Sequence, residues 1–105
     1  MTECVQVSTI AGDRQDASML AYSAVSARLA ASAQIVATPV SVYWFRGQVG
    51  EAEEWQVVLH TTSERYAELE AHLLANHPRD EPDLWAVALS AAPAAYLERI
   101  AAAVS

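Results

Sequence analysis

The side chains that could bind a metal ion or act as bases are few and widely spaced. The chain has three histidines, His60, His72 and His77, and one cysteine, Cys4. They form no standard ligand pair such as H-x-x-x-H or C-x-x-C, so the pattern does not predict a built-in zinc site. A histidine before proline at a helix end often bonds the last carbonyl groups, and we weigh this role for His77 above metal ligation. We expect His72 to be exposed.

Two acidic segments could attract hard cations through carboxylate oxygens. They contain Glu51, Glu53 and Glu54, and Asp80, Glu81 and Asp83. Because surface carboxylates more often serve solubility, we favour solvated charge as the explanation of both.

Other side chains could recognise a small molecule. Arg28 and Arg46 could make bidentate contacts with an anionic ligand, although exposed arginines on a helix and a hairpin are equally natural. Aromatic residues are enriched both in subunit interfaces and in ligand clefts, and we favour the interface. The aromatic residues concerned are Tyr43, Trp44, Phe45, Trp55 and Trp85.

No catalytic motif is recognisable. There is no nucleophile elbow with a Ser-His-Asp order and no phosphate-binding G-x-x-x-x-G-K-[ST] loop, and the chain has only 3 glycines. The sequence therefore predicts a protein that is not an enzyme.

Composition excludes several kinds of partner. A net charge of −7 would repel nucleic acid and anionic lipid. No apolar run approaches the roughly 18 residues of a membrane span, and the first residues do not read as a secretory leader, so we expect a cytoplasmic protein without a membrane partner. A single thiol cannot cross-link its own chain, so packing must stabilise the fold.

These side chains must be positioned by a small set of helices and strands. Alternating and β-branched segments predict strands over residues 4–10, 34–44, 55–61 and 84–89, with a glycine-containing turn over 46–51 and Pro39 marking an edge or a bulge. Apolar periodicity predicts a helix that is capped by Asp13 or Asp16 and runs to about Ser32. A second helix follows a capping box of Thr61 and Glu64 and ends near Asn76, and a short helix begins near residue 94.

The order β-α-β-β-α-β plus a final helix is the split βαβ of ferredoxin-like α+β folds, with an antiparallel sheet and both main helices on one face. We expect one domain over residues 1–105. Two helices cannot cover all of the apolar sheet surface that these strands carry, so we expect the chain to form an oligomer.

Four segments in the right order resemble the CutA family of divalent-cation tolerance proteins over nearly the whole chain. Residues 28–35 read RLAASAQI, similar to the family's R-L-A-A-C block, and residues 41–47 read SVYWFRG, similar to S-x-Y-x-W-x-G. Residues 77–83 read HPRDEPD, similar to H-P-Y-x-x-P-E, and residues 96–100 resemble Y-L-x-W-I.

Five positions within these blocks differ from the residues usual in the family. Ser32 replaces the family's usual cysteine, Phe45 stands at the place of the tryptophan, Arg79 replaces a tyrosine, Asp83 a glutamate and Arg99 a tryptophan.

The resemblance implies a tight homotrimer with clefts between subunits, similar to those of the PII signalling proteins. His60, near one end of a strand, could then face such a cleft, as could Arg28 and Arg46, or it could meet solvent. Copper binding is credited to some members at positions that correspond here to Ser8, Asn76 and His77. Because only His77 keeps a good ligand for copper, it is the one metal-ligand candidate, and Cys4 lies too far along its strand, roughly 13 Å from Ser8, to substitute.

Three functions remain open. The first is a non-catalytic trimer that binds copper, another divalent cation or a small ligand between its subunits. The second is a PII-like sensor of a small anionic metabolite near Arg28, Arg46 and His60. The third is a purely structural trimeric module in which Trp44, Phe45 and Trp55 are fully buried.

Overall fold

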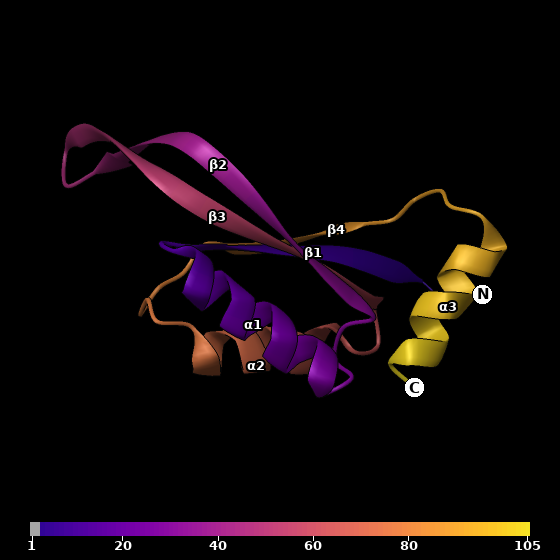
Figure 1. Ribbon diagram of the computed structural model, residues 1–105. Coiled ribbons are helices and arrows are strands. Elements are labelled where there is room, and N and C mark those ends of the chain that lie inside the picture. The colour runs from indigo at the N-terminus through magenta and orange to yellow at the C-terminus, as the bar shows by residue number, and fades with distance from the viewer. Residues whose placement is uncertain (1–2) are drawn as a thin grey trace.

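The computed structural model describes residues 3–105, which form a four-stranded sheet, two helices against it and a third at its end (Figure 1). The elements, in chain order, are β1 (Cys4–Ala11), α1 (Arg14–Ser26), β2 (Ser32–Phe45), β3 (Gln48–Thr62), α2 (Tyr66–Asn76), β4 (Leu84–Ala88) and α3 (Ala94–Ala103). The strand order is β2-β3-β1-β4, and all neighbouring strands are antiparallel. This confirms the predicted split βαβ architecture. No helix within residues 3–105 is long and apolar enough to cross a membrane.

One face of the sheet packs on α1 and α2, as Figure 1 shows. Side chains alternate along a strand, so cross-strand partners such as Val7 and Leu59 point to the same face. The buried cluster joins strand and helix residues: Val7, Ala11, Ala17, Leu20, Ala21, Ala24, Ala30, Val57, Leu59, Leu69 and Leu73. Burial of these aliphatic side chains is the main stabilising term.

Helix α1 begins as predicted but ends earlier. The Asp13 side chain caps it by accepting a bond of 2.8 Å from the Asp16 backbone N–H. The predicted end near Ser32 is wrong, because α1 ends at Ser26 and Arg28 follows with φ of 59°. The Leu29 N–H then bonds the Ala24 carbonyl and the Arg28 N–H bonds the Val25 carbonyl. This is the Schellman pattern, which ends a helix whatever apolar period continues beyond it.

The predicted capping box before α2 is also wrong. Thr61 is fully buried in β3 opposite Val5, and its hydroxyl has no hydrogen-bond partner among the described residues. Helix α2 has Arg65 as its N-cap, with no side-chain capping bond. The Thr62 hydroxyl instead accepts from the Arg65 backbone N–H at 3.3 Å and closes the turn before the helix.

The hairpin of β2 and β3 is longer than predicted. Its turn is only Arg46 and Gly47, both with positive φ, as a two-residue type I′ turn requires. Gly50, assigned to the turn from sequence, lies in β3 opposite Tyr43, where a side chain would meet the Tyr43 ring at 2.9 Å. Strand β2 is an edge strand with an irregularity between Thr38 and Ser41, which confirms the interpretation of Pro39.

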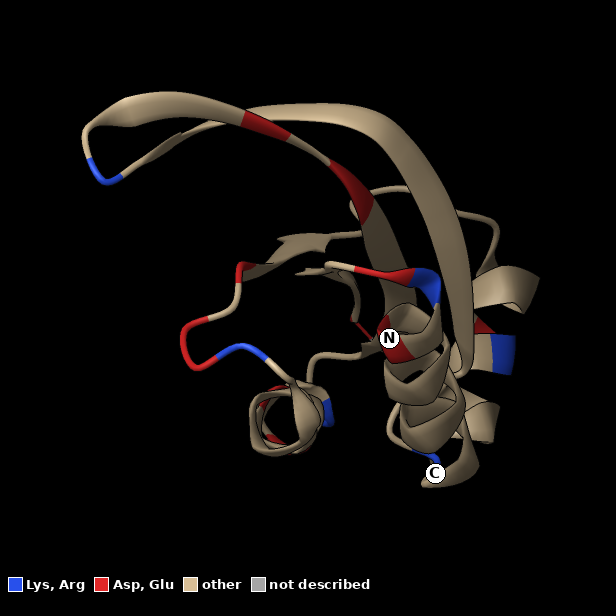
Figure 2. Ribbon diagram, turned by 60° about the vertical axis from the view of Figure 1, so that its left-hand side comes forward, with Lys and Arg blue, Asp and Glu red and all other residues tan. Residues whose placement is uncertain are grey.

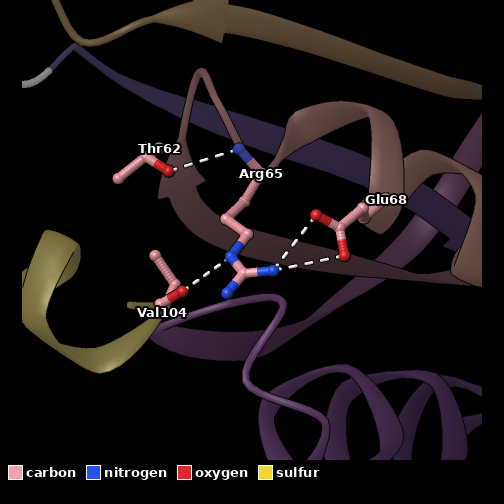
Figure 3. Close-up of polar contacts among 4 residues, drawn as sticks. All are labelled: Thr62, Arg65, Glu68 and Val104. Atoms are coloured by element: carbon pink, nitrogen blue, oxygen red, sulfur yellow. Dashed lines mark hydrogen bonds and ion pairs between the residues drawn. The ribbon is translucent and has the colours of Figure 1, made fainter.

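Helix α3 lies at the end of the sheet (Figure 1), on the face opposite α1 and α2. Tyr96 bonds His60 on that face, and the Cys4 thiol lies 3.9 Å from the Leu97 carbonyl oxygen. The other end of α3 is held by Arg65, whose Nε donates to the Val104 carbonyl at 2.7 Å (Figure 3).

Candidate functional site

A cavity of about 550 Å³ lies between the β2–β3 hairpin and the loop that precedes β4, and we call it the hairpin cavity. Figure 2 shows the hairpin arching over this acidic loop. The lining residues are Gly12, Tyr43, Trp44, Phe45, Ala52, Glu53, Glu54, Arg79, Glu81 and Asp83. Segments far apart in sequence thus meet around one space of ligand size.

The loop that forms one wall is fixed to the sheet. The Thr9 hydroxyl donates to the Asp83 carbonyl at 2.7 Å, and Arg79 donates to the Glu54 carboxylate at 2.9 Å. Glu54 is only 13% exposed, whereas the Arg79 side chain is 39% exposed. A largely buried carboxylate with a charged partner is well satisfied, so this ion pair joins the loop to β3.

His77 anchors the same loop through both ring nitrogens. Its Nε2 lies 2.9 Å from the Ile10 carbonyl oxygen, to which it must donate, and its Nδ1 accepts from the Arg79 backbone N–H at 3.1 Å. Burial lowers the pKa of His77 despite the opposing effect of the Ile10 carbonyl. The neutral ring has its single lone pair on Nδ1, so a metal ion would have to displace the Arg79 N–H there.

Ser8 and Asn76, the other two positions at which copper binding is credited to family members, offer poor metal ligands here. Ser8 is 1% exposed, and the Asn76 amide bonds the His72 carbonyl at 2.8 Å. Burial raises the pKa of the Cys4 thiol, which disfavours the thiolate that a metal would need. Within residues 3–105 no three His, Cys, Asp or Glu side chains lie close enough together to hold a metal ion.

The three residues predicted to line a ligand cleft do not meet within one chain. Arg46 lies at the hairpin tip, while His60 pairs with Ser32 at the other end of β2 and β3, roughly 40 Å away at 3.3 Å per residue. Arg28 follows α1 and lies near the His60 end, where the Ala31 N–H bonds the His60 carbonyl. A shared site of Arg28, Arg46 and His60 would need more than one subunit and stays a prediction.

His60 joins three elements. Its Nε2 lies 3.0 Å from the Gln6 side-chain oxygen on β1, and its Nδ1 lies 2.8 Å from the Tyr96 hydroxyl on α3. The rings of His60 and Tyr96 meet edge to face at 6.0 Å. Burial lowers the pKa of His60, so the ring is neutral near pH 7 and donates through Nε2.

His72 is not simply exposed, as the sequence suggested. It is half-buried, and its Nε2 lies 2.9 Å from the Ser23 hydroxyl, which joins α2 to α1. The signal that could have found this contact is the polar Ser23 on an alanine-rich helix that must pack on another helix.

These features define a small ferredoxin-like α+β protein with a ligand-sized cavity under its hairpin. Its fold and sequence are those of a known family: the family described as CutA1 divalent ion tolerance protein matches residues 5–103, and the chain belongs to this family. The resemblance stated from the four sequence blocks is thereby confirmed.

Individual relatives agree. The chain is 28% identical over 97 residues to the divalent-cation tolerance protein CutA of Pectobacterium atrosepticum, covering 92% of this chain and 88% of the relative. It is 35% identical over 79 residues, 75% of this chain, to protein CutA 1, chloroplastic, of Oryza sativa subsp. japonica, but spans only 45% of that relative's length. The crystal structure of CutA1 from Oryza sativa superposes with a TM-score of 0.93 at 28% identity, covering 99% of this chain and 95% of that one.

Proposed function

We propose that this protein is a non-catalytic, cytoplasmic homotrimer of the divalent-cation tolerance family that binds a metal ion or a small ligand in clefts between its subunits. The lone free cysteine is compatible with a reducing compartment. The relatives named for divalent-cation tolerance support the general role.

The observation that carries the trimer is apolar surface left exposed in a single chain. On the sheet face away from α1 and α2, Val36 is 45%, Trp85 42% and Val87 50% exposed. On the hairpin, Trp44 is 76% and Phe45 60% exposed. Large apolar side chains exposed at both edges of one sheet face and on the hairpin are typical of interface surface, and the edge of β2 that is unpaired within the described chain adds a second reason to associate.

The trimer is tested by multi-angle light scattering at micromolar concentration. We expect three times the chain mass of 11.3 kDa. A monomeric mass would overturn the proposal.

The metal part is tested by calorimetric titration of the metal-free protein with copper(II) and zinc(II). If His77 is a ligand, the His77→Ala variant loses binding while the matched His72→Ala variant keeps it. If the wild-type protein bound neither ion, the metal-binding proposal would be overturned. A small-ligand or purely structural function would then remain.

The charge of the hairpin cavity bears on the choice of ligand. Four carboxylates line it against one guanidinium, so it disfavours a small anionic metabolite. The PII-like alternative therefore depends on Arg28, Arg46 or His60, none of which lines this cavity, and stays a prediction.

A further inference from the structure

We propose that the N-terminal part of helix α3 is a latch, fastened by Tyr96 and His60, that lifts from the sheet in mild acid. This conformational switch goes beyond the proposed metal or ligand binding. It concerns the end of the sheet that α3 itself covers, where the Cys4 thiol is buried.

Helix α3 lies apart from α1 and α2, at the end of the sheet (Figure 1). Among the described residues, the buried core cluster and the side chains packed against it include none from α3. Ile100 and Val104 are buried in its C-terminal part, where Arg65 also bonds the Val104 carbonyl. Residues 89–93, which precede α3, contain no helix or strand. The N-terminal part of α3 can therefore move without disturbing the packing of α1 and α2.

A side-chain hydrogen bond fastens the first turn of α3. The Tyr96 hydroxyl lies 2.8 Å from His60 Nδ1, and His60 Nε2 lies 3.0 Å from the Gln6 side-chain oxygen. Because Nε2 must donate to Gln6, the neutral ring has its lone pair on Nδ1 and accepts from Tyr96. The next residue, Leu97, has its carbonyl oxygen 3.9 Å from the Cys4 sulfur. The closed latch therefore covers Cys4.

The surroundings of His60 do not favour a positive charge. The groups that face its ring are neutral or positive near pH 7: Gln6 and Cys4 on β1, Ser32 on β2, and Tyr96 and Arg99 on α3. The Arg99 guanidinium lies 5.3 Å from the Tyr96 ring centroid. Within residues 3–105 neither His60 nor Arg99 forms an ion pair with a carboxylate.

Protonation of His60 therefore favours the lifted helix. Nδ1 then carries a hydrogen, so Tyr96 can no longer donate to it. The half-buried charge has no carboxylate beside it and is better solvated when water replaces the helix. Burial lowers the pKa of His60, so the closed state disfavours the proton that the open state accepts. By linkage, acid shifts the equilibrium toward the open state.

Labelling of Cys4, the only cysteine of the chain, measures this opening. The probe is 4,4′-dithiodipyridine, and the rate on the whole protein is divided by the rate on the urea-unfolded protein at the same pH. From about pH 7.5 to about 5.5 this ratio should rise severalfold, up to about tenfold, because an exposed imidazole with a pKa of 6.5 becomes mostly protonated over this range. A ratio independent of pH would overturn the inference.

Two pairs of variants assign the fastening. His60→Gln removes the titrating ring and should abolish the rise in acid, whereas His72→Gln on α2 should keep it. Tyr96→Phe removes the bond and should speed labelling roughly fivefold at about pH 7.5, whereas Tyr22→Phe, exposed on α1, should leave the rate unchanged. A full rise in His60→Gln, or wild-type labelling in Tyr96→Phe, would defeat the latch. The tyrosine pair tests the fastening even if His60→Gln does not fold.

Two further measurements separate the latch from other events. Hydrogen exchange of the Val7 amide, in the core of β1, reports global unfolding, so equal opening equilibria at Val7 and Cys4 would overturn the inference. Gln6 pairs with Val87, which we assign to subunit contact, so the mass is recorded at both pH values. A fall in mass parallel to the labelling would mean dissociation and would also overturn it. A constant mass supports the latch, and a constant monomer mass would defeat only the proposed trimer.

Discussion

Burial favours the neutral ring at both His60 and His77, and each ring nitrogen of these residues has a hydrogen-bond partner. His77 donates to the Ile10 carbonyl and accepts from the Arg79 backbone, while His60 lies between Gln6 and Tyr96. Burial lowers the pKa of both rings below the usual value of 6.5. The folded chain therefore resists protonation that the unfolded chain accepts.

This difference predicts a loss of stability in mild acid. Below pH 6.5 the unfolded state binds more protons than the folded state, so the free energy of unfolding falls until the folded pKa is reached, and the full contribution is present above 6.5. Urea unfolding of a His60→Gln, His77→Gln variant should therefore show a smaller loss of stability between pH 7.5 and 5.5, approximately, than the wild type.

Tyr96→Phe is the control for this measurement. It removes the bond to His60 but leaves both imidazoles, so it should lower stability while stability still falls in mild acid. If the double histidine variant lost stability with falling pH as steeply as the wild type, His60 and His77 would not be the cause of the acid sensitivity.

At the scale of elements, the end of α1 contains a residue in a conformation that does not suit it. Arg28 occupies the left-handed position of the Schellman pattern, which is usually glycine. The backbone of an L-residue there costs about 1–2 kcal/mol.

Arg28→Gly should therefore raise the free energy of unfolding by roughly 0.5–1 kcal/mol, after allowing for the greater freedom of glycine in the unfolded chain. Chemical denaturation measures this change in the free energy of unfolding. Ala27→Gly is the matched control, because Ala27 has φ of −80° and gains nothing from glycine, and it should destabilise. Equal loss in both variants would show that Arg28 carries no backbone strain.

The C-terminal end of helix α3 is hydrogen-bonded to the rest of the chain by one side chain, that of Arg65. Arg65 donates from Nε to the Val104 carbonyl and from Nη1 to Glu68, as Figure 3 shows. The Glu68 pair is an exposed contact within one helical turn and contributes little, so the bond to Val104 is the important one.

Arg65→Met should lower stability by roughly 1 kcal/mol and should increase hydrogen exchange over residues 94–104 more than elsewhere. Arg14→Met, a charge loss at the exposed start of α1, should leave exchange in α3 unchanged. If α3 stays equally protected in both variants, its packing through Ile100 and Val104 is sufficient without Arg65.

At the scale of the whole molecule, the open sheet face predicts where subunits meet. Val87 on β4 is 50% exposed and lies on that face, whereas Leu74 on α2 is 47% exposed on the helix layer. Val87→Asp should convert the proposed trimer to monomer at micromolar concentration, because a charge would be buried without a partner. Leu74→Asp should leave the mass unchanged in the same light-scattering experiment. The reverse result would place the interface on the helices.

Much of this architecture was predictable from local patterns. Alternation and β-branched residues located the strands, Asp13 identified the start of α1, and Pro39 marked the irregular edge strand. These features depend on a few neighbouring residues, so the sequence alone contains them. Four short blocks also sufficed to indicate the family that residues 5–103 match.

The candidate site was only partly predictable. The acidic and aromatic residues were recognised, but as solvated charge and interface core, since no local pattern shows that residues 43–45, 52–54 and 79–83 share one space. Arg28 and Arg46, the arginines proposed from sequence, do not line this cavity. Their positions also depend on contacts that no local pattern shows.

The sequence by itself thus determined the order of elements, the chain's acidity and the absence of recognisable catalytic motifs. Only the tertiary structure decided that His77 uses both nitrogens on backbone groups, that Arg79 is neutralised by Glu54, and that a cavity opens beneath the hairpin. The physical reason is that these outcomes depend on contacts between residues distant in sequence, and the direction of a side chain across such contacts is set by packing.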